Sequence, residues 1–263
     1  MADVKWTEKK VAVGDNELAV IEGGTGDPVV VFHEELGHPG ITNWHEEMAR
    51  EYTVLIPHHP GFGRTDRVEW INSVRDLAAF YGRAFKSEGL LPASVIGFSL
   101  GGWIAAEMAA CNASLFKRLV LVAPFGIRPP EGDIADMFQV TAKKYLDSSV
   151  KTIERNQEFA KLYGGEPTPE QFEAWEDARA ESARLAWVPY MFNPSLGPLL
   201  ECGEEVKTLI IWGRDDEISP SSAAAVYQNA IQGSELLLLD DCGHRPEVEK
   251  TGVFVSKIKQ FLS

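Results

Sequence analysis

The sequence predicts an α/β fold in which a mostly parallel sheet carries helices on both faces. Short, largely apolar runs alternate with amphipathic stretches along most of the chain, which is the pattern of repeated strand and helix units. The runs show little polar alternation, as expected for strands covered on both faces. The chain has 263 residues, 44% of them hydrophobic, which is enough for a substantial core.

Each predicted strand or helix is indicated by a local sequence pattern. The short apolar runs predict strands, and Pro57 closes one of them. Between residues 73 and 87, Val74, Leu77, Phe80 and Ala84 recur at helical spacing and form one apolar face. The expected strands are residues 17–21, 29–32, 53–56, 94–96, 118–122, 206–212 and 235–239, and the expected helices are 43–50, 73–87, 100–110, 221–231 and 248–262.

Residues 128–203 interrupt this alternation and predict a helical insertion. They contain no strand-like run, and prolines bound them at Pro129-Pro130 and between Pro194 and Pro198. We therefore expect residues 1–127 and 204–263 to form the core domain and 128–203 an inserted helical unit. The helices expected in it are residues 134–146, 151–162 and 169–184.

Composition narrows the possible partners. With 25 Lys and Arg against 39 Asp and Glu, the net charge of −14 repels nucleic acids and anionic membrane surfaces. No stretch approaches the roughly 20 apolar residues of a membrane span, and residues 1–13 lack a signal-peptide pattern, so a cytoplasmic location is expected. Cys111, Cys202 and Cys242 are few and widely spaced, which indicates free thiols.

A possible nucleophile lies in Gly97-Phe98-Ser99-Leu100-Gly101-Gly102. A serine between an expected strand and helix, with glycines two residues away on each side, is typical of a sharp turn that exposes its hydroxyl. The helix N-terminus favours developing negative charge, and the amide of Leu100 is a candidate oxyanion donor. The other interpretation is a chance match, and only the flanking strand and helix argue against it.

An acid and a base follow in the order that this chemistry requires. The apolar strand through Trp212 ends at Asp215 and Asp216, at the edge where parallel sheets bind ligands. We expect Asp216 to orient the base and Asp215 to shape a turn or cap a helix. His244 stands on the loop after the last strand, the position of a general base.

Together these motifs resemble the α/β-hydrolase superfamily. The segments G-F-S-L-G-G, W-G-R-D-D-E-I-S-P, C-G-H and H-P-G-F-G-R-T (residues 59–65) are similar to its cap-bearing esterases, lactonases, carbon-carbon bond hydrolases, perhydrolases and epoxide hydrolases. The resemblance implies an eight-stranded sheet, a helical cap after the sixth strand, and neither metal nor organic cofactor. Epoxide hydrolases and haloalkane dehalogenases of this branch carry an aspartate at the elbow, so Ser99 argues against both.

One segment departs from the family pattern. Where the family usually has His-Gly, this chain reads His33-Glu34-Glu35-Leu36-Gly37. By position, the amide of Glu35 should complete the oxyanion hole, although carboxylates there oppose negative charge unless they point away. A solvated loop carboxylate is the simpler interpretation, and an acid with a raised pKa is the functional one.

The other histidines and the aromatic residues of the insertion have structural interpretations as well. His33 and His59 match family positions that brace loops, and His38 and His45 show no metal-ligand spacing. For the substrate pocket we expect contributions from Phe98 and from an apolar stretch of the insertion, although core packing explains that stretch equally well. Its candidate residues are Trp187, Tyr190, Met191 and Phe192.

These features predict a serine hydrolase for a small, largely apolar ester or lactone, acting through an acyl-enzyme as a monomer or homodimer. Carbon-carbon bond hydrolases share the same three residues and remain an alternative. Their dienol acid substrates favour polar pockets, and the only candidate arginines are Arg128, Arg179 and Arg184. A non-catalytic ligand-binding relative is the second alternative, which the altered segment after His33 favours.

Overall fold

The computed structural model describes residues 4–153 and 156–263, and their strands form one eight-stranded sheet with the order β1-β2-β4-β3-β5-β6-β7-β8. The strand β2 pairs antiparallel with β1 and β4, and the remaining neighbours are parallel. The strands are β1 Trp6–Val13, β2 Asn16–Gly24, β3 Asp27–Phe32, β4 Tyr52–Pro57, β5 Ala93–Phe98, β6 Phe116–Val122, β7 Thr208–Gly213 and β8 Glu235–Leu239. The predicted fold class is confirmed.

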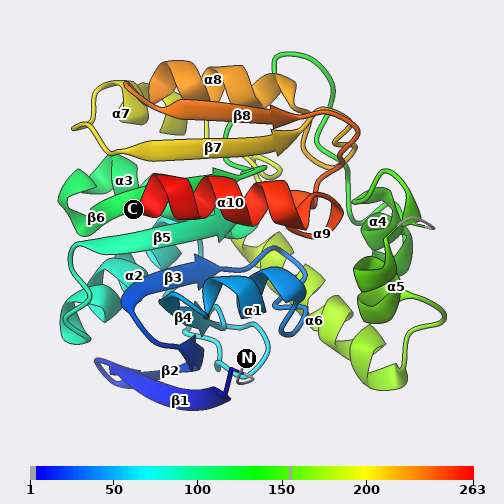
Figure 1. The fold of residues 1–263 in the computed structure, drawn as a ribbon, viewed down its shortest axis with the longest axis horizontal. Helices are drawn as coiled ribbons and strands as arrows, with labels where there is room; N and C mark the ends of the chain where they lie inside the picture. Colours follow the sequence, from blue (N-terminus) through cyan, green and yellow to red (C-terminus); the bar gives the residue numbers. More distant parts are fainter. Residues whose placement is uncertain (1–3, 154–155) are drawn as a thin grey trace.

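Helices cover both faces of this sheet, as Figure 1 shows. One apolar cluster packs α2, α3 and α8 against one face, and a second packs α1 and α10 against the other. Along β3 the side chains alternate between the two clusters: Val30 and Phe32 join the first, and Val29 and Val31 the second. The core helices are α1 Asn43–Met48, α2 Val74–Ser87, α3 Leu100–Cys111, α8 Ser222–Ala230, α9 Pro246–Glu249 and α10 Thr251–Leu262, with a short 3₁₀ turn at Ala113–Leu115.

The first strand is absent from the sequence-based prediction. In β1 only Val11 and Val13 are buried, and the preceding residues are mostly exposed. An edge strand of this kind is held by its backbone pairing to β2, so it leaves no apolar run in the sequence.

The described residues between β6 and β7 form the helices α4 Ala142–Ser148, α5 Gln157–Tyr163, α6 Pro169–Ala186 and α7 Leu196–Glu201. The expected helix at 134–146 starts later, because Asp136 accepts a hydrogen bond from the Phe138 amide in a local turn and Thr141 caps α4. The expected helix at 151–162 starts at Gln157 after the cap Asn156, and its residues 154–155 lie outside the described residues. The helix α6 begins at a capping box of Thr168 and Gln171, close to its expected start.

The helices α4, α5 and α6 lie beyond the end of the sheet to which the parallel strands point (Figure 1). The helix α7, which was not predicted, lies apart from them and packs against α3 and α8 of the core. The segment between β6 and β7 is therefore divided between a group over the sheet edge and a helix on the core face. Among the described residues, no helix combines the length and apolar character needed to cross a membrane.

Candidate active site

Ser99 stands at a strained turn between β5 and α3. Its backbone has φ 49° and ψ −111°, a region that residues other than glycine rarely adopt. The flanking glycines allow this turn to pack tightly: a Cβ on Gly101 would lie 2.4 Å from the Phe32 carbonyl oxygen, and one on Gly97 would lie 2.6 Å from the Gly101 carbonyl oxygen. The local fold thus holds the serine at the carboxyl edge of the sheet.

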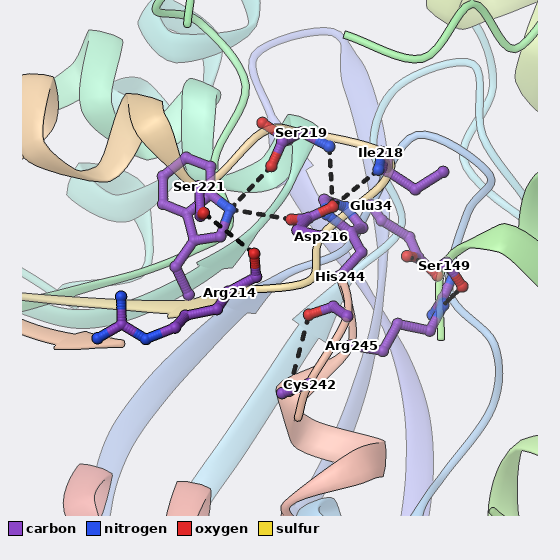
Figure 2. A network of polar contacts seen from close by, with 12 residues as sticks. Glu34, Ser149, Arg214, Asp216, Ile218, Ser219, Ser221, Cys242, His244 and Arg245 are labelled. Carbon is purple, nitrogen blue, oxygen red and sulfur yellow. Dashed lines mark hydrogen bonds and ion pairs between the residues drawn. The ribbon is translucent and has the colours of Figure 1, made fainter. Parts of the chain in front are cut away.

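Asp216 and His244 are joined by a buried hydrogen bond of 2.7 Å between Oδ2 and Nδ1. The other carboxylate oxygen of Asp216 accepts from the amides of Ile218 and Ser219 (Figure 2). The Oδ2 atom of Asp216 also accepts from the indole of Trp212. These donors fix the carboxylate, and the carboxylate in turn orients the imidazole.

His244 has an environment suited to proton transfer. Burial lowers its pKa, but the charge and hydrogen bond of Asp216 outweigh that effect, and the pKa is raised above its ordinary value. The Nε2 atom of His244 and the Oγ of Ser99 are both buried, and neither has a hydrogen-bond partner among the described residues. A proton acceptor and a hydroxyl are thus both free for a reaction partner.

Asp215 differs from Asp216 in its exposure and in its partner. Its side chain is exposed and forms an ion pair with Lys151 at 2.8 Å. That ion pair lowers the pKa of Asp215. The sequence-based hypothesis was that Asp216 orients the base and that Asp215 shapes a turn or caps a helix; in the structure only Asp216 contacts His244, and Asp215 lies in a surface ion pair.

Two backbone amides are free to stabilise an oxyanion. Leu100 is the first residue of α3, so its N–H has no acceptor within the helix. The N–H of Glu35, in the turn after β3, has no hydrogen-bond acceptor in the described part of the chain. Both candidate donors therefore have the free N–H groups that an oxyanion hole requires.

The side chain of Glu35 is not a solvated loop carboxylate, and that interpretation of the sequence was wrong. Glu35 is 1% exposed, and its Oε1 accepts a hydrogen bond of 2.7 Å from the hydroxyl of Tyr145 in α4. Its carbonyl oxygen accepts from the hydroxyl of Ser182 in α6 at 2.8 Å. Two helices of the 128–203 segment, α4 and α6, therefore form hydrogen bonds with Glu35.

The side chain of Glu34 is buried as well, in an ion pair with Arg245. The two side chains meet at 2.6 Å, and the Nε of Arg245 also donates to the hydroxyl of Ser149, which lies beside them in Figure 2. Burial raises the pKa of Glu34, although Arg245 opposes the shift. Sequence reasoning missed Arg245, although a charged residue directly after the candidate base, in a chain with an unusual glutamate after β3, was an available signal.

The histidines near the site brace its loops, as the sequence suggested. His33 Nε2 accepts from the amide of His59 at 3.0 Å, and His33 Nδ1 lies 2.7 Å from the Glu34 carbonyl oxygen, to which it donates. His59 pairs with the hydroxyl of Tyr81. Burial lowers the pKa of His59 to about 3, so both rings are neutral supports for the turn that carries Glu34.

The aromatic stretch of the insertion does not face the site as a unit. Trp187 is 50% exposed and packs at the surface on Phe138 and Tyr190, and Phe192 lines a different hollow beside Trp103. For Trp187 and Phe192 the pocket expectation is therefore not supported, because Trp187 lies at the surface and Phe192 lines this other hollow.

Met191 and Tyr190 are held by the segments around them. Met191 is fully buried in the core cluster. The hydroxyl of Tyr190 donates to the Ala135 carbonyl oxygen and accepts from the Met137 amide. Burial raises the pKa of Tyr190, and the charges of Asp136 and Glu35 add to that shift, so Tyr190 has an electrostatic link to the site.

Comparison with known proteins identifies the family of this chain. Residues 29–256 match the alpha/beta hydrolase family, and the chain belongs to that family. It is 25% identical to 2-hydroxy-6-oxo-2,4-heptadienoate hydrolase from Pseudomonas putida, over 97% of this chain and 96% of that protein. It is 24% identical to pyrrolizixenacetamide deacetylase from Xenorhabdus hominickii, over 96% and 97%.

Solved structures show the same fold. Naproxen esterase from Bacillus subtilis superposes with a TM-score of 0.79 at 18% identity, over 99% of this chain and 92% of that one. The 2-hydroxy-6-oxo-6-phenylhexa-2,4-dienoate hydrolase from Rhodococcus gives 0.77 at 18% identity, over 98% and 99%. These two structures share the fold of this chain, and the names of the similar proteins describe hydrolases, a deacetylase and an esterase.

Proposed function

We propose that this chain is a serine hydrolase that cleaves a small, uncharged carboxylic ester or lactone through an acyl-enzyme intermediate. The observation that carries the proposal is the unpartnered hydroxyl of Ser99 at a strained turn, together with a histidine whose Nδ1 is held by Asp216 and whose Nε2 is free. A weak nucleophile with an oriented base is what acyl transfer requires.

The proposed mechanism uses these groups in sequence. His244 Nε2 takes the proton of Ser99 as Oγ attacks the carbonyl carbon, and the amides of Leu100 and Glu35 receive the oxyanion. Collapse expels the alcohol, to which His244 returns the proton. Water then gives a proton to His244, attacks the acyl-enzyme, and releases the carboxylic acid with Ser99 restored.

The charges around the site favour an uncharged substrate. Glu34 and Glu35 are both buried beside the candidate oxyanion amides. Of the candidate arginines, Arg179 donates to the carbonyl oxygens of Met137 and Val140, and Arg184 pairs with Glu181. Arg128 is exposed, and the guanidinium groups of Arg179 and Arg184 already have partners within the chain.

A second candidate is hydrolysis of a carbon-carbon bond. It is supported by the names of several similar proteins, among them the heptadienoate hydrolase of Pseudomonas putida and 2-hydroxymuconate semialdehyde hydrolase of Pseudomonas sp. at 26% identity. Their dienoate substrates carry a carboxylate, for which an arginine is the usual partner. The engagement of the arginines described above makes this the second choice.

One panel of substrates tests both proposals and the non-catalytic alternative. It contains p-nitrophenyl esters of increasing acyl length, a set of lactones, and a 2-hydroxy-6-oxo-dienoate. We expect turnover of short esters or lactones by the wild type and loss of at least a thousandfold in Ser99→Ala with an unchanged circular dichroism spectrum. Preferential cleavage of the dienoate would support the second candidate, and Ser99→Ala activity above about a tenth of wild type would remove Ser99 as nucleophile.

A further inference from the structure

A small hollow lies next to α1. The residues of its wall that matter here are Glu34, His38, His45, Phe98, Arg245 and Glu247. Three of these are the chain neighbours of Glu35, Ser99 and His244, and neighbouring Cα atoms lie about 3.8 Å apart. Burial raises the pKa of Glu34 and of Glu247, and the charge of His244 opposes both shifts, so the hollow lies within electrostatic range of the candidate base.

The wall of this hollow carries polar atoms that nothing in the described chain satisfies. Glu34 Oε1, Glu247 Oε2, His45 Nε2 and His38 Nε2 are buried without a hydrogen-bond partner. Glu34 and Glu247 are each 6% exposed and His45 is 2% exposed. Buried polar groups in folded proteins are paired with few exceptions, so a cluster of four around one hollow indicates that the hollow holds water or a ligand with matching polar groups.

The wall offers both donors and acceptors. His45 Nδ1 faces the amide and hydroxyl of Thr42 at 3.2 Å and 2.7 Å. Burial keeps the pKa of His45 well below its usual value, so the ring is neutral and its proton lies on Nε2, which donates. Glu34 uses Oε2 for Arg245 and keeps Oε1 as an acceptor.

The wall is also nearly balanced in charge. Glu34 and Arg245 neutralise each other at 2.6 Å. Burial raises the pKa of Glu247 to about 8 despite the neighbouring Arg245, so this carboxyl is largely protonated at neutral pH. Its acid group can donate or accept. Glu34 would repel a substrate carboxylate, and Arg245 would repel a substrate ammonium. A purely apolar group would leave the polar atoms of the wall without hydrogen-bond partners.

We propose that this hollow binds a hydroxyl group of the substrate, placed a few bonds from the scissile carbonyl. A hydroxyl is uncharged and both donates and accepts, which matches the wall. The inference rests on the proposed hydrolase function and narrows its substrate class to hydroxy esters or esters of polyols. Glu34, His45 and Glu247 contact the hydroxyl, and Phe98 packs against the adjoining carbon chain.

Paired esters that differ by one isosteric replacement test this proposal. Methyl 3-hydroxybutanoate is compared with methyl 3-methylbutanoate, and 2-hydroxyethyl butanoate with propyl butanoate, so that a hydroxyl on either side of the ester is sampled. We expect kcat/KM to be at least tenfold higher for the hydroxy member of one pair. Equal values in both pairs would overturn the proposal and leave ester hydrolysis itself intact.

Variants connect that preference to the hollow. In Glu247→Leu and His45→Phe we expect the ratio between the two members of the preferred pair to fall at least fivefold, whereas Glu247→Gln, which keeps a donor and an acceptor, retains it. The matched control is His58→Phe, because His58 also has a buried unpartnered nitrogen but lies outside this wall. A ratio that is unchanged in both test variants, or that falls equally in His58→Phe, would contradict the assignment.

A binding measurement separates this proposal from the proposed function. Ser99→Ala is titrated calorimetrically with both members of each pair, since this variant binds esters without turning them over. Tighter binding of a hydroxy ester, lost in Ser99→Ala combined with Glu247→Leu, supports the subsite even if wild-type turnover of esters is absent. Equal binding of both members overturns the subsite whatever the turnover.

Discussion

The hydroxyl of Tyr145 donates a hydrogen bond of 2.7 Å to the carboxylate of Glu35. This contact joins helix α4 to the turn that carries the candidate oxyanion amide, and Ser182 of α6 holds the same residue through its carbonyl oxygen. The helices above the sheet edge therefore help to position a backbone group of the candidate site as well as to cover it.

Tyr145→Phe should affect catalysis as well as stability. The substitution removes the hydrogen-bond donor of Glu35 Oε1, and Oε2 of the same carboxylate already lacks a partner. A buried acceptor left unsatisfied lowers the free energy of unfolding by about 1–3 kcal/mol. We expect a loss of that size in urea unfolding and a fall in kcat that exceeds any change in KM, because the Glu35 amide moves. The control is Tyr190→Phe, which loses hydrogen bonds within the same segment but none to Glu35. A selective fall in kcat in this control would contradict the interpretation.

The pH dependence of activity should report His244. Because Asp216 raises the pKa of the imidazole and the base must be neutral, kcat/KM should rise with pH through a midpoint above 6.5. In Asp216→Asn the negative charge is gone, so the midpoint should move to lower pH while kcat falls by about 10⁴.

Asp215→Asn is the matched control for that variant. It breaks an exposed ion pair with Lys151 and should change kcat by no more than a few fold with the same midpoint. The opposite ranking of the two variants, measured on one ester over the full pH range, would assign the orienting acid to Asp215.

The ion pair of Glu34 and Arg245 should be strongly coupled in a double-mutant cycle. Removing one partner leaves a buried charge uncompensated, which costs about 3–5 kcal/mol, whereas replacing both by apolar residues is often nearly neutral. We expect Glu34→Leu and Arg245→Met each to lower the free energy of unfolding by that amount, and the double variant to recover most of it. Additive losses would show that the two side chains contribute independently.

Glu247 should make stability depend on pH in a defined direction. Its pKa is raised from 4.5 to about 8 in the folded chain, so the folded state prefers the protonated acid. The contribution to stability is present below pH 4.5 and is lost as the pH rises through 8. The melting temperature of Glu247→Gln minus that of the wild type should therefore increase between pH 5 and pH 9. A decrease over that range would mean that the ionised carboxylate stabilises the fold through Arg245.

The sequence by itself determined the fold class and the candidate nucleophile, acid and base. Buried parallel strands leave uninterrupted apolar runs, and a serine between two close-packed glycines leaves a short local motif, so both can be recognised without coordinates. Asp215 and Asp216 both follow β7, and the hydrogen bond of 2.7 Å between Asp216 and His244 agrees with the choice of Asp216.

Only the tertiary structure decided which partners the side chains of Glu34 and Glu35 bind. Tyr145 is 110 residues from Glu35 in the chain, and Arg245 is still farther from Glu34, so no local pattern indicates either pair. The edge strand β1 and the helix α7 depend in the same way on the neighbours that they pair with or pack against. Propensity and periodicity act over a few residues, whereas the burial of a charge and the choice of its partner depend on which distant segments the fold brings together.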